Sequence, residues 1–372
     1  MSELNSKVLL ALAKVIDPEL RRPITELGMV GEVIVSENSF SVTIKLTVSH
    51  CPQADYLEAE TKKALAAEFP IDSFQVLMSV MTAEELADLK LKLRDGKEPK
   101  ANPFTEGTAT KVFLIGSGKG GVGKSSITVN VAVELAKQGY EVGIIDADIF
   151  GFSIPGQLGT TDRPTRLDDM ILPPVAHGVK VISIGMFLPG NEPVAWRGPM
   201  LHKAVEQFLT EVYWGNLDFL LIDMPPGTGD VAISIGQLLP TAKTIVVTTP
   251  QQAAATVAER SGTAGLKTGQ EIFGVIENMS YLVQADGSTL ELFGVGGGEL
   301  VVKSLSERTG TTIPLLGKIP LSLPLRKGSD AGNPVVLEHP EDEASIEIKS
   351  IAKSLIDSKL PAAARTLKVT LT

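Results

Sequence analysis

The chain has 372 residues, of which 43% are hydrophobic and 21% charged, an ordinary composition for a globular protein with more than one domain. Its formal net charge of −10 argues against broad binding to nucleic acid or to an anionic membrane surface. No apolar run approaches the roughly 18 residues of a membrane span, and no secretory signal is evident. The single cysteine excludes an internal disulfide. We therefore expect a cytoplasmic protein with no nucleic-acid or membrane partner.

A small α/β domain is predicted over residues 1–92. Helical and alternating apolar spacings predict a helix, two strands, a helix and a strand, over residues 7–16, 30–35, 40–48, 54–68 and 74–80. The polar stretch 93–108 follows, with two prolines and no apolar periodicity. We interpret it as a linker.

A larger domain is predicted over residues 109–360. Short, nearly continuous apolar runs recur along it, at residues 111–115, 142–145, 179–184, 219–222, 244–247, 273–276 and 312–316. Such runs are typical of strands covered on both faces, and helical patterns lie between them. The fold class expected is therefore α/β, with a doubly wound, mostly parallel sheet. The tail over 361–372 is too short and too weakly basic for an amphipathic membrane anchor.

A phosphate-binding loop is predicted between the first of these strands and a helix. Gly118, Gly123, Lys124 and Ser125 match the pattern G-x-x-x-x-G-K-[ST]. Glycines let backbone N–H groups surround phosphate oxygens at the positive end of a helix dipole. Lys124 would reach the β- and γ-phosphates of ATP, and the Ser125 hydroxyl would ligate Mg²⁺. The strand and helix on either side disfavour a merely flexible turn, and the predicted nucleotide-binding residues are Gly118, Lys119, Gly120, Gly121, Val122, Gly123, Lys124, Ser125 and Ser126.

A second lysine, Lys119, lies inside the same loop. It cannot easily serve the phosphates bound by its own chain. The form Lys-Gly-Gly-Val-Gly-Lys-Ser resembles the deviant P-loop of the MinD/ParA-like ATPases, and that resemblance implies a catalytic Lys119 that reaches the partner's nucleotide across a dimer. The alternative is a solvated loop lysine.

Three aspartates follow predicted strands. Asp146 and Asp148 end one strand, and Asp223 ends another. A lone aspartate there is usually a cap or turn residue, but three of them after a phosphate loop predict a functional set. We expect Asp223, with Ser125 and Asp146, to hold Mg²⁺ and its water, and Asp148 to position the attacking water.

A further loop over residues 225–230, Pro-Pro-Gly-Thr-Gly-Asp, is a candidate γ-phosphate sensor. Two prolines limit its conformations, and Gly227 could offer its backbone N–H to the phosphate.

These motifs, together with Trp196-Arg-Gly-Pro-Met200, Thr248-Thr-Pro-Gln251, Glu277-Asn-Met-Ser280 and Gly317-Lys-Ile-Pro320, closely resemble those of the Mrp family of P-loop ATPases, the iron–sulfur cluster carrier proteins. The N-terminal unit, with Asp17-Pro-Glu and Cys51-Pro52, resembles the SufT-type domain of Fe–S assembly factors.

The resemblance implies ATP hydrolysis by a homodimer that serves Fe–S assembly factors or apoprotein clients. It also implies that Asn278 contacts adenine, although a turn-forming asparagine is an alternative. Trp196 and Arg197 either face the dimer interface or form a core anchor with its ion-pair partner.

The chain departs from the family's pattern at the cluster ligands. Family members that bind a cluster usually carry Cys-x-x-Cys after the Asn-Met-Ser motif, whereas residues 281–290 contain no cysteine and Asp286-Gly287 predicts a hairpin turn. Cys51 is the only thiol. It is either a small half-buried residue or a ligand or transfer thiol favoured as thiolate at a helix N-terminus, with His50 beside it as a possible metal ligand.

Two functions from different classes follow. The first is an ATP-hydrolysing carrier that transfers Fe–S clusters to apoproteins. The second is an ATP-driven dimeric switch or adaptor in Fe–S assembly that holds no cluster, which the missing Cys-x-x-Cys favours. A membrane- or DNA-positioning ATPase is a weaker third hypothesis, because the net charge is negative.

Overall fold

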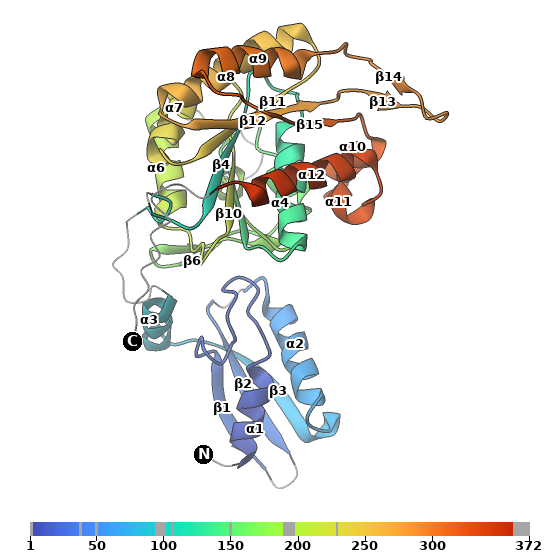
Figure 1. Ribbon diagram of the computed structural model, residues 1–372. Coiled ribbons are helices and arrows are strands. Elements are labelled where there is room, and N and C mark those ends of the chain that lie inside the picture. The colour runs from blue at the N-terminus through green and yellow to red at the C-terminus, as the bar shows by residue number, and fades with distance from the viewer. Residues whose placement is uncertain are drawn as a thin grey trace, which may run out of the picture. The chain divides into compact units, whose positions relative to one another are not determined.

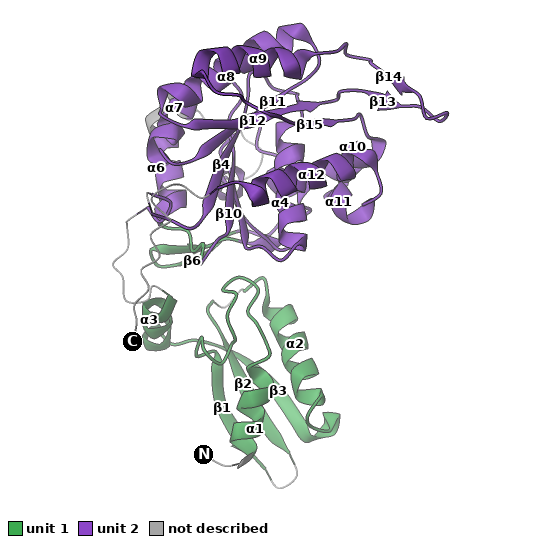
Figure 2. Ribbon diagram, in the orientation of Figure 1, with its two compact units in different colours: residues 1–101, 164–173, 211–215 green, residues 102–163, 174–210, 216–372 purple. Residues whose placement is uncertain are grey.

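The structure is a computed structural model that describes residues 3–36, 39–48, 51–93, 102–105, 107–148, 151–188, 198–227 and 230–359. The chain divides into two units (Figure 2). Unit 1 comprises residues 1–101, 164–173 and 211–215, and unit 2 comprises residues 102–163, 174–210 and 216–372. Within the predicted linker, Asn102 Nδ2 donates to Leu238 O at 2.9 Å and Phe104 is buried in unit 2. The predicted borders at residues 92 and 109 stay predictions.

Unit 1 contains a three-stranded sheet with helices, and the hairpin of β6 and β7. Its elements are α1 (Glu3–Leu12), β1 (Val30–Val35), β2 (Phe40–Leu46), α2 (Ala54–Ala66), β3 (Phe74–Val80), α3 (Ala83–Leu93), β6 (Thr165–Leu167) and β7 (Met170–Leu172). Strand β2 lies between β1, antiparallel, and β3, parallel. Its alternate residues Phe40, Val42, Ile44 and Leu46 enter the core, which confirms the predicted alternation.

The first helix starts and ends earlier than the predicted range 7–16. Ile16 forms an antiparallel bridge with Pro23, which requires extended backbone at that position. The Asp17 carboxylate then accepts hydrogen bonds from the N–H groups of Glu19 and Leu20 and closes a turn. Local side-chain bonding therefore ends the helix before its apolar pattern does.

Within the described residues, unit 2 is built on an eight-stranded sheet in the order β15-β12-β11-β4-β10-β5-β9-β8, in which only β8 is antiparallel to its neighbour. Strands β15, β12, β11, β4 and β10 of this sheet are labelled in Figure 1. The strands are β4 (Lys111–Ser117), β5 (Val142–Asp146), β8 (Val175–Ala176), β9 (Val179–Ser183), β10 (Phe219–Asp223), β11 (Lys243–Thr248), β12 (Glu271–Asn278) and β15 (Leu315–Ile319). The helices are α4 (Lys124–Lys137), α5 (Ile154–Gln157), α6 (Gly198–Thr210), α7 (Asp230–Leu238), α8 (Gln252–Lys267), α9 (Gly297–Thr309), α10 (Leu323–Ala331), α11 (Val335–Glu338) and α12 (Glu343–Asp357).

Helices cover both faces of this sheet, as β11 demonstrates. Ile245 and Val247 belong to the core that contains α4 and α12 residues, whereas Val246 belongs to the core that contains α8 and α9 residues. Successive side chains of a strand point to opposite faces, so each face buries its own apolar layer. The doubly wound α/β fold expected from the apolar runs is confirmed.

Two local predictions in unit 2 have different outcomes. The hairpin signal at Asp286-Gly287 is confirmed, because β13 (Leu282–Val283) pairs with β14 (Thr289–Leu290). The strand predicted over 312–316 forms instead over Leu315–Ile319. Gly317 and Lys318 pair with β12 as strand residues, so the pairing with β12 outweighs the low strand propensity of glycine.

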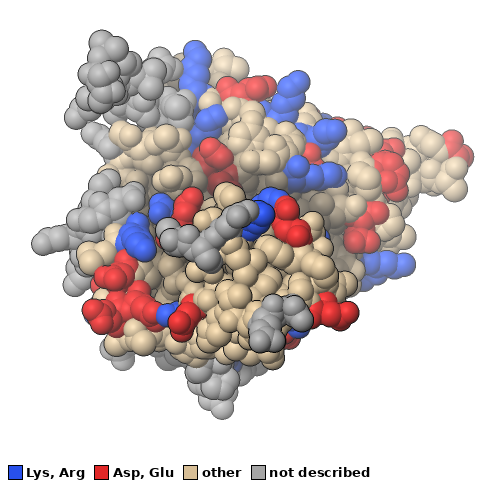
Figure 3. Space-filling view, turned by 90° about the horizontal axis from the view of Figure 1, so that it is seen from below, with Lys and Arg blue, Asp and Glu red and all other residues tan. Residues whose placement is uncertain are grey.

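The face shown in Figure 3 carries acidic and basic side chains close to one another. Within the described residues, no helix is both long and apolar enough to cross a bilayer.

Candidate functional site

The loop between β4 and α4 is shaped by close approaches that only glycine permits. Gly123 caps α4 with φ of 81°, and a Cβ there would lie 2.2 Å from Asn278 Nδ2. A Cβ at Gly118 would lie 2.2 Å from the backbone carbon of Val257 in α8. The loop therefore packs closely against Asn278 of β12 and against α8, and it leads directly into α4.

The strand register brings the predicted aspartates to this loop. Asp223 of β10 lies opposite Ile115 of β4 on one side and Asp146 of β5 on the other. Because parallel strands end at the same sheet edge, both carboxylates meet the start of α4. The structure therefore brings together Lys124, Ser125, Asp146, Asp148 and Asp223.

Asp223 is the centre of the polar contacts. It is fully buried, and its Oδ2 accepts from Lys124 Nζ at 2.6 Å and from Ser125 Oγ at 2.6 Å. Its Oδ1 accepts from Thr128 Oγ1 at 2.9 Å. A buried carboxylate requires such partners, since an unpaired one is strongly disfavoured.

Asp146 is also fully buried, and its bonds fix its position. It accepts from Ser183 Oγ at 3.0 Å and from the N–H of Asp148 at 3.2 Å. Burial, followed by repulsion from Asp223, raises the pKa of Asp146 to about 7, against the opposing hydrogen bond from Ser183. A cation placed between Asp146 and Asp223 would relieve this repulsion.

Asp148 lies at the mouth of the site. It is 8% exposed, and its Oδ1 accepts from the N–H of Gly151 at 3.2 Å. Its Oδ2 lies 3.9 Å from Lys124 Nζ. The carboxylate is therefore held beside the phosphate-binding lysine without forming its closest ion pair.

Two adjoining cavities open onto the loop. The first, of about 410 Å³, is lined by the loop from Lys119 to Ser126 and by Asp148; we call it the P-loop cavity. The second, of about 760 Å³, is mainly apolar and lies between α10 and the chain around Met279; we call it the outer cavity. Both are lined by Gly123, Ser126, Ser153 and Gln157, so they form one continuous space.

Three further predicted residues, Lys119, Asn278 and Gly227, each donate a hydrogen bond within the protein. Lys119 Nζ donates to Gln251 Oε1 at 3.1 Å. Asn278 is the last residue of β12, not a turn, and its Nδ2 donates to Val122 O at 2.8 Å, while it also lines the outer cavity. The Gly227 N–H donates to Ser117 O at 2.8 Å, so contact with a phosphate requires that bond to open.

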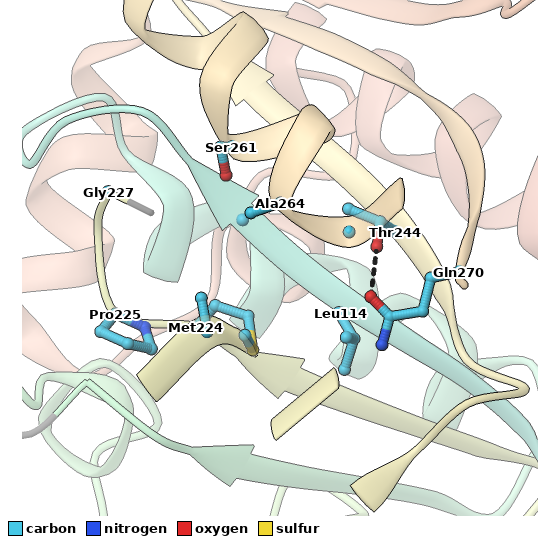
Figure 4. Close-up of a pocket in the computed structure, with 11 residues that line it drawn as sticks. Leu114, Met224, Pro225, Gly227, Thr244, Ser261, Ala264 and Gln270 are labelled. Atoms are coloured by element: carbon cyan, nitrogen blue, oxygen red, sulfur yellow. Dashed lines mark hydrogen bonds between the residues drawn. The ribbon is translucent and has the colours of Figure 1, made fainter. Parts of the chain in front are cut away.

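A third cavity lies behind the loop that contains Gly227 (Figure 4). Its volume of about 20 Å³ leaves room for about one water molecule. The Thr244 hydroxyl and the Gln270 side chain are hydrogen-bonded at its wall, at 3.3 Å. This space is too small for a nucleotide and separates the loop from α8.

Sequence reasoning missed three residues that support the site. Thr128, one turn after Lys124 in α4, bonds Asp223. Ser183 ends β9 in register with Asp146 and bonds it. Gln251, before α8, holds Lys119. Helical spacing could have revealed Thr128, but the other two contacts depend on strand order and tertiary packing.

Hard oxygen donors make the site suitable for Mg²⁺. Asp146 and Asp223 supply carboxylates from neighbouring strands in register, and Ser125 supplies a hydroxyl that donates to Asp223. Mg²⁺ is usually bound through one or two carboxylates together with substrate phosphates. In the described part of the chain, no three His, Cys, Asp or Glu side chains form a metal-holding group by themselves.

Burial disfavours the thiolate alternative for Cys51. Burial raises the pKa of the Cys51 thiol to about 11, with further contributions from Glu19 and Asp17. A hydrogen bond from the Gln53 backbone opposes the shift without overcoming it. The half-buried alternative fits this residue. His50, Trp196 and Arg197 lie outside the described residues.

Comparison with known proteins gives consistent matches. The profile described as NUBPL iron-transfer P-loop NTPase matches residues 108–356, and one described as iron–sulfur cluster assembly protein matches residues 5–73. The iron–sulfur cluster carrier protein of Mycobacterium tuberculosis (strain ATCC 25618 / H37Rv) is 51% identical over 355 residues, covering 95% of this chain and 93% of that protein.

The carrier protein of Deinococcus radiodurans is 39% identical and covers 95% of each chain. Among solved structures, a nucleotide-binding protein from Archaeoglobus fulgidus in complex with ADP is 35% identical. It covers 63% of this chain and 90% of its own, with a TM-score of 0.53.

Proposed function

The chain belongs to the NUBPL iron-transfer family of P-loop NTPases, and on that premise we propose that it binds ATP with Mg²⁺, hydrolyses it as a cytoplasmic homodimer, and carries iron–sulfur clusters to apoproteins. The observation that supports nucleotide binding most strongly is the convergence of Lys124, Ser125 and Asp223 at the start of α4.

In this mechanism the backbone N–H groups over Gly118–Ser126 surround the phosphates, and Lys124 exchanges Asp223 for phosphate oxygens. Ser125, Asp146 and Asp223 would hold Mg²⁺, which supplies charge neutralisation on the β- and γ-phosphates. The nucleoside would occupy the outer cavity beside Asn278.

Turnover is assigned to Asp148 and Lys119. The Asp148 carboxylate faces the P-loop cavity and is positioned to orient a water molecule for attack. Lys119 is held by Gln251 and would leave it to reach the nucleotide of a second protomer. The Gly227 N–H would exchange Ser117 O for the γ-phosphate and so report its presence.

One observation favours a second candidate, an ATP-driven adaptor that holds no cluster. Cluster ligation requires thiolates, and Cys51, whose pKa is raised to about 11, is the only cysteine. A homodimer would contribute two thiols, so a bridging [4Fe–4S] cluster would need further ligands from a client.

Anaerobic reconstitution with iron and sulfide separates the two candidates. We expect the wild-type protein to hydrolyse ATP in the presence of Mg²⁺. If it carries a cluster through its own thiol, it will also gain thiolate–iron charge-transfer absorbance that Cys51→Ala loses. Retained ATPase activity with no bound iron in either protein would favour the adaptor, and the absence of Mg²⁺-dependent hydrolysis would refute the ATPase itself.

A further inference from the structure

We infer that the hairpin segment, residues 281–295, forms a movable wall of the nucleoside site and changes its exposure when a nucleotide binds. This inference rests on the proposed nucleotide binding and adds to it. The segment carries β13 and β14 and extends outward from the end of β12 (Figure 1). No residue of this segment lines the P-loop cavity, so the proposed phosphate binding does not involve it.

The outer cavity is walled by two separate segments. Leu282 of β13 and Leu292 after β14 line it from the hairpin segment. Leu321 and Leu323, which precede and begin α10, line it as well. Apolar side chains around a space that adjoins the P-loop suit the flat apolar faces of a nucleobase.

The solvent exposure of the leucines that line the outer cavity also supports a nucleobase as its occupant. Leu292 is 54% exposed and Leu323 is 64% exposed, although both line the cavity. A base seated between them would remove apolar surface from water on both walls. The shared lining residues Gly123 and Ser126 place that base next to phosphates held by the loop.

The hairpin segment is a short two-stranded ladder closed by a tight turn. Two residue pairs, Leu282 with Leu290 and Val283 with Thr289, join β13 to β14. Beyond them, the backbone N–H and the side-chain amide of Gln284 donate to Ser288 across the turn. An isolated two-stranded hairpin is marginally stable in water. Its root is fixed, because Leu321 N donates to Tyr281 O at 2.7 Å. We therefore expect contacts made by Leu282 and Leu292 to determine the position of the hairpin segment beyond Tyr281.

This arrangement couples nucleotide occupancy to an apolar surface. Leu290, Phe293 and Val295 are exposed large hydrophobic residues in the same segment. They do not line the cavity. When the base fixes Leu292, the neighbouring Phe293 and Val295 become fixed too, so the protein presents a different surface with nucleotide than without it.

Hydrogen exchange measured by mass spectrometry on the full chain tests the coupling. The probes are Mg²⁺ with ADP and Mg²⁺ with pyrophosphate, which share phosphates but not the base. We expect both probes to slow exchange in the loop at 118–126. Only ADP should slow exchange over residues 281–295.

A matched pair of variants tests the wall. Leu292→Ser should weaken ADP binding by about tenfold and leave pyrophosphate binding within about twofold, measured by calorimetry. Val295→Ser, on the same hairpin segment but outside both the cavity and the pairing of β13 with β14, should bind both probes as the wild type does. Both side chains are substantially exposed, so neither change should unfold the protein, and circular dichroism checks this.

The outcomes distinguish this inference from the proposed function. If ADP binds and protects the loop but leaves the hairpin segment unchanged, or if Leu292→Ser and Val295→Ser bind ADP equally, the movable wall is wrong and nucleotide binding stands. If neither ADP nor pyrophosphate binds the wild-type protein, both fall.

Discussion

Lys124 is a buried lysine whose ammonium group has one close partner in this site. It is 6% exposed and pairs with the fully buried Asp223. Lys124→Ala should reduce ATP affinity by more than 100-fold, because the phosphates lose their cation. It should also destabilise the nucleotide-free protein by about 3 kcal/mol, because Asp223 loses its buried ion pair. Calorimetric binding and urea unfolding measure the two effects; unchanged affinity would contradict the assignment.

Asp148 should affect a different step. Its carboxylate is held by Gly151 and lies farther from Lys124 than that of Asp223 does. Asp148→Ala should leave the Kd for ATP within about threefold and lower kcat by about 100-fold or more. Equilibrium binding and steady-state hydrolysis separate these terms, and a variant that loses affinity and kcat together would assign Asp148 to binding instead.

The raised pKa of Asp146 predicts a pH dependence of stability. Its pKa moves from 3.8 to about 7 on folding, so the unfolded chain ionises first as the pH rises. The stability contribution is complete below pH 3.8 and is lost as the pH rises through about 7. Between pH 5 and 8 the nucleotide-free protein should lose about 3 kcal/mol from this group.

Asp146→Asn is the matched variant, since it keeps the shape and cannot ionise. Urea unfolding at several pH values should show a flatter profile for the variant than for the wild type. Parallel profiles would mean that Asp146 is already ionised in the folded protein at pH 5.

At the residue scale, the sequence indicated which types of side chain matter better than what they contact. Lys124, Ser125, Asp146 and Asp223 were predicted, because motif spacing and strand ends carry that information. The partner of Lys119 was not, because Gln251 lies 132 positions away along the chain. The sequence left two alternatives open for Cys51, because burial depends on packing that no local pattern records.

At the scale of elements, the conformation of the loop at 118–126 requires a close approach of its backbone at Gly118 to helix α8. Gly118→Ala should destabilise the protein by about 2 kcal/mol or more and weaken nucleotide binding, because its Cβ would meet the backbone of Val257 and Ala258. Gly120→Ala, where a Cβ has nothing within 4 Å, is the control and should fold normally. Thermal unfolding compares the two variants. Equal melting temperatures would show that α8 moves to make room for the added methyl group without loss of stability.

Elements with long apolar runs were predicted well, and their ends less so. β1 and β3 form over the predicted residues, although neither alternates strictly in burial and a register shift interrupts β1 between Val30 and Val33. β15 and α1 are displaced, and in each case pairing or turn formation with distant or following residues decides the boundary. Periodicity therefore predicts that an element exists more securely than where it ends.

At the scale of the whole molecule, a trans role for Lys119 makes a prediction about mixed protomers. Lys119→Ala should bind ATP but hydrolyse it slowly, and Lys124→Ala should not bind it tightly. A mixture should regain activity, because Lys119 of the Lys124→Ala protomer can serve the nucleotide of the other. Hydrolysis in equimolar mixtures tests this, with each variant alone as control. Activity that merely averages the two would place Lys119 in its own site.

The family was predictable from the sequence, since many separate motifs agree over most of the chain. The division between the units was not fully predictable. Residues 164–173 and 211–215 belong to unit 1 although they lie within the sequence of the larger domain. Such long-range association leaves no periodic signal.

The three donors on Asp223 have a consequence for timing. Lys124, Ser125 and Thr128 already satisfy that carboxylate within the protein, so an arriving nucleotide gains only the difference between two sets of bonds. The same internal bonds are ready to reform as products depart. These internal hydrogen bonds therefore compete with the nucleotide for Lys124 and Ser125. They should lower the affinity for nucleotide and favour the release of the hydrolysis products, as repeated turnover requires.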